Sequence, residues 1–290
     1  TWSFMDDKLA AEFGSNDNQA AESLRVVNPI STELSQMRPS ILPNLIEAAQ
    51  KNHDRGFSNA ALFEIGPVYK SAQADGHLMT AAGIRFASAG VRHWADPQAH
   101  RTVDLYDAKA DALAVLRGCG APADSAQVTR DAPDYYHPGR SAVLRLGPNV
   151  LAQFGEIHPA IMDSMGISQA VVGFEVFLNN VPAPKKKGKQ IPLLQLSAFQ
   201  PVQRDFAFVV DQDVEAMDLV KAVKTADKKL IQDVSVFDVY SGDKMETGKK
   251  SVAINIVIQP EQRTLTDQEL EDISQKVINT VTQKTGGVLR

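Results

Sequence analysis

The chain contains very little cysteine and no long hydrophobic run. Its single cysteine, Cys119, cannot form a disulfide within the chain, and such sparse cysteine is typical of a reducing compartment. No apolar segment approaches the roughly eighteen residues that predict a membrane-spanning helix. No basic patch followed by an apolar core marks a secretion signal near Thr1. We therefore expect a cytoplasmic protein that does not enter a membrane.

Positive charge is also scarce. The 290 residues include 30 Lys and Arg against 35 Asp and Glu, which gives a net charge of −5. The final stretch, residues 197–290, is net negative as well. Proteins bind phosphate backbones through an excess of Lys and Arg, so non-specific nucleic-acid binding is excluded and DNA is not an expected partner. Any contact with RNA must be confined to one face of the molecule.

The sequence patterns of metal and nucleotide sites are missing. Cys119 has no second cysteine to pair with, and no two histidines stand four positions apart, so no zinc site is expected. No Walker or Rossmann glycine pattern appears. His137 and His158 each precede a proline, which indicates structural turns rather than catalysis. We therefore expect no catalytic residue and no metal ligand here, and we expect Cys119 to be buried and inert.

A break near residues 182–189 divides the chain. Prolines, a glycine and four lysines crowd into this run, which cannot bury apolar side chains and so predicts a linker or an exposed loop. We expect one domain at residues 1–190 and a second at 197–290. In the first, the patterns predict helices at 40–53 and 104–117 and strands at 60–65, 77–87, 141–146, 150–154 and 171–178. Such a mixture predicts an α+β domain on a mostly antiparallel sheet.

The second domain has a clearer order. We expect strands at 204–211, 234–240 and 250–259, helices at 215–225 and 267–282, and a last short strand at 288–289. This is the βαββαβ order of a ferredoxin-like fold. Thr266 and Glu269 have the spacing of a capping box at the start of the final helix, and Gly286 and Gly287 follow its end.

Strand alternation predicts which side chains of the second domain face away from its helices. The core side is marked by Phe206, Phe208, Val210, Phe237, Val239, Val252, Ile254, Ile256 and Ile258. The opposite side is left to Ala207, Asp238, Tyr240 and Ser251, which converge on one exposed patch. A tyrosine ring can stack on an unpaired base, and a carboxylate or hydroxyl can bond to base edges. The second face of such a sheet also carries polar residues that bind nothing, so both interpretations stand.

Four runs in the second domain resemble the ferredoxin-fold anticodon-binding domain of the bacterial phenylalanyl-tRNA synthetase beta subunit. They are Arg204–Phe208, Phe237–Gly242, Gly248–Ser251 and Arg263–Glu269. The resemblance implies that Ala207, Asp238, Tyr240 and Ser251 read or stack on anticodon bases of the phenylalanine tRNA. It also implies phosphate contacts from Arg204, Lys250 and Arg263, although Arg263 could equally pair with a nearby carboxylate.

Runs in the first domain resemble the class II synthetase-like domain of the same subunit. They are Arg25–Ile30, Met37–Pro43, Leu62–Gly66, Tyr136–Ala142 and Gly155–Pro159. Nearly the whole chain is covered, which implies that it is the C-terminal part of a longer beta subunit. A class II site would need an arginine soon after the strand at 60–65 to hold an ATP phosphate, and Lys70 stands there instead. The resemblance therefore implies a non-catalytic counterpart of the catalytic alpha subunit.

The resemblance as a whole implies a binding and scaffold role within phenylalanine–tRNA ligase. The first domain would dock on the alpha subunit, in a heterotetramer of two alpha and two beta subunits, and the second would hold the anticodon arm of tRNA(Phe). ATP and magnesium would serve the complete enzyme, with no cofactor bound by this chain. Two alternatives remain open: a stand-alone synthetase-like ligase, and a protein-interaction module with no role in RNA binding.

Overall fold

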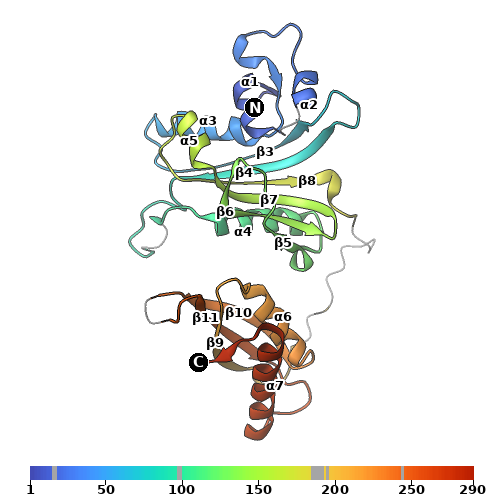
Figure 1. Ribbon diagram of the computed structural model, residues 1–290, viewed down its shortest axis with the longest axis vertical. Coiled ribbons are helices and arrows are strands. Elements are labelled where there is room, and N and C mark those ends of the chain that lie inside the picture. The colour runs from blue at the N-terminus through green and yellow to red at the C-terminus, as the bar shows by residue number, and fades with distance from the viewer. Residues whose placement is uncertain (15–17, 97–99, 184–192, 194–195, 243–244) are drawn as a thin grey trace. The chain divides into compact units, whose positions relative to one another are not determined.

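The chain forms two compact units in the computed structural model, unit 1 at Thr1–Gly188 and unit 2 at Lys189–Arg290 (Figure 1). The structure describes residues 1–14, 18–96, 100–183, 193, 196–242 and 245–290. The expected linker at 182–189 therefore lies mostly outside the described residues. All strands that pair among the described residues run antiparallel, and helices accompany both main sheets. The predicted α+β class is confirmed.

A six-stranded antiparallel sheet forms the centre of unit 1, in the order β3-β4-β8-β7-β6-β5. Its strands are β3 (Ala60–Tyr69), β4 (His77–Phe86), β5 (Gln127–Thr129), β6 (Tyr136–Leu146), β7 (Asn149–Ile157) and β8 (Val171–Phe177). The predicted hairpin is present as β6 and β7. The central strand β8 is buried along its whole length, as its nearly continuous apolar sequence predicts.

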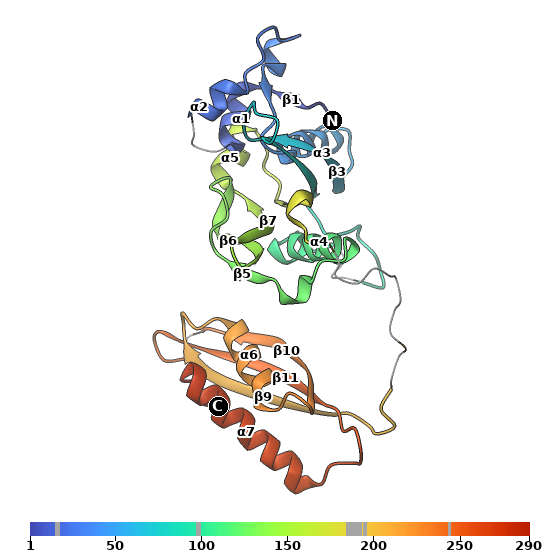
Figure 2. The same cartoon turned by 90° about the vertical axis from the view of Figure 1, so that its right-hand side faces the viewer.

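Two helices pack on opposite faces of this sheet (Figures 1 and 2). Neighbouring residues of a strand point to opposite faces, and Ala82 joins the core cluster that contains α3 (Leu42–His53). Its neighbour Ala81 joins the cluster that contains α4 (Leu105–Gly118). Both helices lie where the 3.6-residue periodicity predicts them, and the sheet between them has two separate hydrophobic cores.

Several short helices and strands at the start of unit 1 were not predicted from the sequence. They are β1 (Phe4–Met5), α1 (Asp7–Phe13), α2 (Asn18–Ser23) and β2 (Gln36–Met37), and a further short helix, α5 (Pro159–Ser164), follows β7. Segments this short carry too few residues to show a helix or strand period. Phe13 anchors α1, because its buried ring packs against Tyr135 with 5.1 Å between ring centroids.

Cys119 is exposed at the C-terminal end of α4, so the expectation that it is buried was wrong. Helical periodicity correctly predicts that Ala112 and Leu116 are buried, but it applies only to residues within the helix. Cys119 is the first residue beyond the end of α4, where that periodicity no longer determines which side a residue faces.

Unit 2 is built on a four-stranded antiparallel sheet with the order β10-β11-β9-β12. Its elements are β9 (Val202–Asp211), α6 (Ala216–Ala226), β10 (Ile231–Tyr240), β11 (Lys249–Ile258), α7 (Asp267–Thr285) and β12 (Val288–Leu289). This chain order confirms the predicted ferredoxin-like fold. Both helices join a single core with the sheet, which includes Leu219 of α6, Val277 of α7 and Ile254 of β11 (Figure 2).

The predicted capping box begins α7. The Thr266 hydroxyl accepts a hydrogen bond from the Glu269 backbone N–H at 3.4 Å, and the Glu269 carboxylate accepts one from the Thr266 backbone N–H at 2.9 Å. At the other end Gly286 has φ of 69°, a left-handed conformation that favours glycine. Both ends of the helix are therefore where the sequence predicted them to within three residues.

Candidate nucleic-acid interface

Among the described residues of unit 2, both helices pack on one side of the sheet and none packs on the other. Phe208 of β9 and Val252 of β11 point into the core beneath α6 and α7. Their sequence neighbours Ala207 and Ser251 point to the other side, because side chains alternate along a strand. We call this other side, which bears Ala207, Ser251 and Ala253, the helix-free face.

A bulge in β10 determines which of its residues reach the helix-free face. Val236 pairs with Ile254, but the next pair along joins Asp238 to Ala253, so Phe237 is an extra residue without a partner. Residues directly opposite each other in a sheet share a face. Asp238 therefore lies on the same face as Ala253, and Tyr240 on the same face as its partner Ser251.

The four predicted base contacts lie in two neighbouring rows across the sheet. Asp238, Ala253 and Ala207 form one row, and Tyr240, Ser251 and Val209 form the next. Directly opposite side chains in such rows start about 4.5–5.5 Å apart. Asp238 is exposed, and Tyr240 is 36% exposed on the side away from the helices. The structure thus brings the four side chains together, while their contact with bases stays a prediction.

Ser251 departs from the expected exposed patch. It lies on the helix-free face, but only 4% of its surface is accessible. The cause is its position on β11, an inner strand of the sheet, with Tyr240 on one side and Val209 on the other. A side chain as small as serine is shielded by larger neighbours in its own row. Ser251 therefore lies at the base of the face beside the tyrosine ring.

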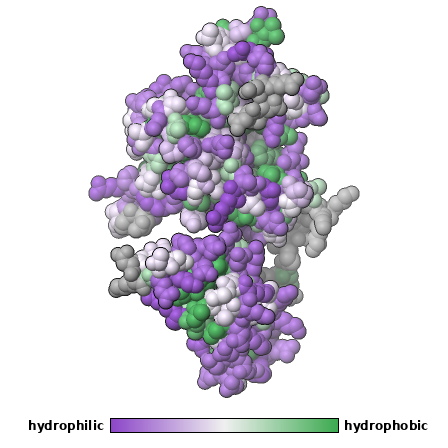
Figure 3. All heavy atoms as spheres, in the orientation of Figure 1, coloured by the Kyte–Doolittle hydropathy of each residue, from purple (hydrophilic) through white to green (hydrophobic). Residues whose placement is uncertain are grey.

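Phe237 and Val239 were predicted to be core residues, and this was wrong. Phe237 is 59% exposed and Val239 is 51% exposed. Phe237 is the bulge residue, and Val239 points to the helix side like its partner Val252 but lies on an edge strand. Alternation predicts the direction of a side chain and not whether a helix reaches it. Figure 3 shows hydrophobic residues at the surface of unit 2 as green spheres.

The Tyr240 ring lies close to Gly242. A Cβ atom placed on Gly242 would be 2.6 Å from the Tyr240 hydroxyl oxygen and 2.7 Å from Cζ. These distances are much shorter than an ordinary van der Waals contact of about 3.5–4.0 Å. The absence of a side chain at Gly242 therefore lets the ring occupy its present position on the helix-free face.

The three predicted phosphate contacts do not join this group. Arg204 and Lys250 are paired with core-facing Ile256 and Val210, so they start from the helix side of the sheet. The Lys250 ammonium donates to the Gln212 carbonyl oxygen at 2.8 Å. Alternate residues of a strand point to the same side. Arg204 therefore points to the core side like Phe206, and Lys250 does so like Val252.

Arg263 is engaged in an ion pair. Its guanidinium donates to both carboxylate oxygens of Glu269, at 2.9 and 2.5 Å. Hydrogen bonds from Arg263 and from the Thr266 backbone lower the pKa of Glu269 to about 2. The alternative of pairing with a nearby carboxylate is therefore the arrangement that the structure shows, and Arg263 supports the start of α7.

Two cations on the helix-free face were missed. Lys249 stands two residues before Ser251 and so shares its face, where its ammonium pairs with Asp211 at 2.5 Å. The backbone N–H of Arg290 donates to the Ala207 carbonyl at 2.8 Å, which continues the β12 edge beside Ala207. Strand alternation could have predicted that Lys249 lies on this face. The place of Arg290 could not be predicted in this way, because it depends on the pairing of β12 with β9.

Acidic side chains outnumber these cations on the helix-free face. Asp205 and Asp211 of β9 and Asp233 and Asp238 of β10 all pair with residues that point to this side. The Asp205 carboxylate accepts from the Asn255 amide at 2.7 Å. A face of this charge offers little general attraction to phosphate, so it suits contacts with bases better than contacts with the backbone.

Unit 1 carries a lysine at the position where the resemblance calls for an ATP-binding arginine. This residue, Lys70, follows β3 and places its ammonium 5.4 Å from the centroid of the Phe177 ring. No three His, Cys, Asp or Glu side chains are grouped as metal ligands within the described part of the chain. In the same part of the chain, no helix is both long and apolar enough to cross a membrane.

Arg38 and Glu64 form a structural ion pair near the first residues of the chain. Arg38 is fully buried and donates to the Pro67 carbonyl at 2.9 Å and to the Glu64 carboxylate at 2.8 Å. Burial raises the pKa of Glu64, while hydrogen bonds from the Thr1 hydroxyl and from Arg38, and the charge of Arg38, lower it. This charge pair joins residues 1–3 to β3.

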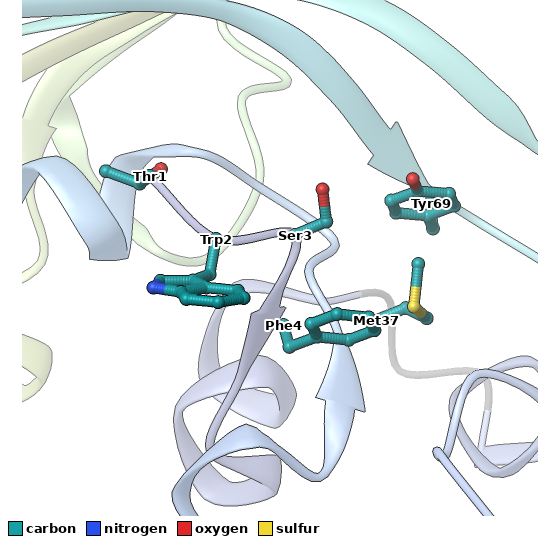
Figure 4. Close-up of a pocket in the computed structure, with 6 residues that line it drawn as sticks. All are labelled: Thr1, Trp2, Ser3, Phe4, Met37 and Tyr69. Carbon is teal, nitrogen blue, oxygen red and sulfur yellow. The ribbon is translucent and has the colours of Figure 1, made fainter. Parts of the chain in front are cut away.

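A shallow pocket of about 560 Å³ lies beside these residues (Figure 4). Trp2, Phe4, Met37 and Tyr69 supply most of its lining, and Figure 4 shows Met37 extending toward the Tyr69 ring. The part of the lining that the structure describes is mainly apolar.

Comparison with known families follows the division into two units. Residues 1–178 match the family described as "Phenylalanyl tRNA synthetase beta chain CLM domain". Residues 197–290 match the family described as "Ferredoxin-fold anticodon binding domain". Both matches confirm the resemblance inferred from the sequence runs.

Similar curated proteins carry one description. The chain is 49% identical to the phenylalanine–tRNA ligase beta subunit of Bradyrhizobium diazoefficiens, 48% to that of Paramagnetospirillum magneticum and 47% to that of Rhodospirillum rubrum. Each alignment covers 100% of this chain and 36% of the relative, so the chain spans about a third of the length of the curated relatives it matches. By the family match over residues 1–178, more than half of its length, the chain belongs to the phenylalanyl-tRNA synthetase beta chain family.

Proposed function

We propose that this chain acts in phenylalanine–tRNA ligase as part of the beta subunit, in the cytoplasm, where unit 2 holds the anticodon arm of tRNA(Phe). The observation that carries the proposal is the two-row arrangement of Ala207, Asp238, Tyr240 and Ser251 on the helix-free face. The match of residues 197–290 to an anticodon-binding family supports the same assignment.

The chemistry of the face suits an unpaired loop. The Tyr240 ring would stack on a base, which is worth roughly 1–3 kcal/mol. The Asp238 carboxylate accepts hydrogen bonds only, so it favours bases that present N–H groups at their edge. Ala207 leaves room for a base in the row next to that of Tyr240, and Arg290 and Lys249 are better placed than Arg204, Lys250 or Arg263 to reach phosphates. Holding the anticodon arm would orient the rest of the tRNA and supply geometry rather than bond chemistry.

Substitution of Tyr240 tests this proposal. Tyr240→Ala should weaken tRNA(Phe) binding by the assembled ligase about 5- to 150-fold, the equivalent of one lost stack. Tyr106→Ala is the matched control, because Tyr106 is an exposed tyrosine on α4 of unit 1. Unchanged affinity of the Tyr240 variant in a filter-binding titration, with the variant still folded, would contradict the proposal.

Unit 1 would dock on the alpha subunit in a complex of two alpha and two beta chains. Phe63, Ile65 and Met79 form an exposed apolar strip on β3 and β4, at the edge of the six-stranded sheet. Exposed apolar patches of this kind commonly mark protein–protein interfaces. Phe63→Asp should reduce co-purification with the alpha subunit, and a variant that co-purifies as well as the unaltered chain would remove this strip from the interface.

ATP and magnesium would serve the complete ligase, because unit 1 has Lys70 where a class II site would need an arginine. The measurement that checks this is ATP–pyrophosphate exchange with phenylalanine. We expect no exchange by the chain alone and exchange once the alpha subunit is added. Exchange above background by the chain alone would make it a stand-alone ligase.

A further inference from the structure

Unit 1 contains a cavity of about 840 Å³ that the proposed function does not use. Its lining includes residues of α1, α2, β2, β3, β7 and β8, elements that are far apart in the sequence. Small-molecule sites in proteins usually measure about 300–1,000 Å³ and combine apolar walls with a few polar groups. This cavity has both features.

A buried polar network lines one part of the cavity. Glu175 is 1% exposed, although it lies in the otherwise apolar strand β8. Its carboxylate accepts hydrogen bonds at 2.7 Å from each of Ser40 Oγ, the Tyr135 hydroxyl and Gln153 Nε2. Burial raises the pKa of Glu175, and these hydrogen bonds and the charge of Lys70 oppose the shift. Among the described residues, no Lys or Arg side chain forms an ion pair with this carboxylate.

Glu175 retains capacity for another donor. A carboxylate offers about four acceptor positions. The described donors occupy one position on Oε1 and two on Oε2, so Oε1 has one position left. An ammonium group is the donor that a buried carboxylate favours most, because the interaction is assisted by charge. Phosphate and carboxylate groups would be repelled at the same point.

The cavity walls favour the same kind of group. Phe13, Tyr69, Tyr135 and Phe177 all line the cavity, and the faces of aromatic rings attract cations. They also provide apolar surface for a ring of the ligand to stack on. Lys70 lines the cavity with its ammonium 5.4 Å from the Phe177 ring centroid. Arg25, another cation of the lining, is paired with Asp7 at 2.7 Å, so Lys70 is better placed to meet an anionic group of a ligand.

We propose that this cavity binds an aromatic α-amino acid. The ammonium group of the ligand donates to Glu175, its carboxylate pairs with Lys70, and its ring lies against the aromatic walls. Neither an amine without a carboxylate nor a carboxylic acid without an amine satisfies both charged groups. The inference is independent of tRNA binding, which belongs to unit 2.

Three probes with the same ring separate these contributions in isothermal titration calorimetry on the complete 290-residue chain. L-phenylalanine carries both charges, phenethylamine carries only the ammonium and hydrocinnamate carries only the carboxylate. We expect L-phenylalanine to bind most tightly and hydrocinnamate most weakly. The proposal is overturned by hydrocinnamate binding as well as phenethylamine, or by L-phenylalanine giving no heat at millimolar concentration.

Variants then assign the two ends of the ligand. Lys70→Gln should weaken L-phenylalanine binding about tenfold and leave phenethylamine unchanged, because only the former has a carboxylate. Glu175→Gln should weaken both ligands at least about tenfold. Lys51→Gln, at an exposed position of α3, is the control and should change neither.

Lys70 is exposed, so its variant keeps the test decisive even where Glu175→Gln fails to fold. Equal loss of both ligands in Lys70→Gln, or no loss of either, overturns the proposal. Because the assay contains no tRNA, failure of anticodon binding in unit 2 leaves its result unaffected.

Discussion

Gly242 offers a way to move the Tyr240 ring without removing it. A Cβ atom at this position would lie 2.6 Å from the tyrosine oxygen and 2.7 Å from Cζ. An ordinary contact needs about 3.5–4.0 Å, so in Gly242→Ala the ring must shift by roughly 1 Å. Gly242 does not adopt a left-handed backbone conformation, so alanine imposes no backbone strain. The substitution should therefore displace the ring and leave the fold intact.

The size of the effect follows from the value of a base stack. Complete loss of a stack worth roughly 1–3 kcal/mol weakens binding about 5- to 150-fold. A ring displaced by about 1 Å keeps some of its overlap with the base, so we expect Gly242→Ala to weaken tRNA(Phe) binding about tenfold. The thermal unfolding of the chain should change little, because Tyr240 lies on the exposed side of an edge strand.

The assay is a filter-binding titration of the assembled ligase with tRNA(Phe), run as a double-mutant cycle. If Gly242→Ala acts only through the ring, it should have no further effect in a chain that already carries Tyr240→Ala. Two results would refute the reasoning. One is full affinity in Gly242→Ala beside weak binding in Tyr240→Ala, and the other is an additive loss in the double variant.

Three further predictions concern the stability and reactivity of the chain. Thr266→Ala removes the side-chain cap of α7 and should cost unit 2 about 1 kcal/mol in differential scanning calorimetry of the whole chain, while no change would place the stability of α7 elsewhere. The hydrogen bond and the charge of Arg38 lower the pKa of Glu64 from its usual 4.5, so this pair stabilises unit 1 above that value and the stabilisation is lost as the pH falls below about 4.5. Glu64→Gln should flatten the stability profile in this window, and an unchanged acid profile would contradict the assignment. Cys119 should react with a thiol reagent in the folded chain, and reaction only after denaturation would contradict its exposure.

The alternation of side chains along the strands correctly predicted which face of the sheet the candidate site residues point to. The apolar residues of Val252–Ile258 fix the core side of β11, and this determines the opposite direction for Ser251 and Ala253. The same rule failed for accessibility, because it does not report which neighbours flank Ser251 or how far a helix extends over Val239. Those facts depend on cross-strand pairing, which the sequence pattern does not contain.

The phosphate contacts illustrate a different limit. The phosphate contacts of Arg204 and Lys250 were predicted from the family resemblance. The sequence already indicated the other face, because each residue stands two positions before a core residue, Phe206 or Val252. Arg290 could not be found from local pattern, because its place beside Ala207 results from the return of β12 to β9.

In unit 1 the long periodic helices and strands were predictable, and the buried polar network was overlooked. The signal was present as a single acid, Glu175, within the apolar run Val171–Phe177. A lone charged residue in such a run requires buried partners. Its partners Ser40, Tyr135 and Gln153 lie in distant parts of the sequence, so their identity required the structure.

The bulge at Phe237 divides β10 into two parts in which different positions face the helices. Before it, Val234 and Val236 point to the helix side, and after it that orientation passes from even to odd positions. Asp238 and Tyr240 therefore lie on the helix-free face, while Val234 and Val236 point to the core side. Removing Phe237 would leave Asp238, Val239 and Tyr240 opposite the same residues of β11, so the bulge residue itself should be dispensable for the direction of the tyrosine.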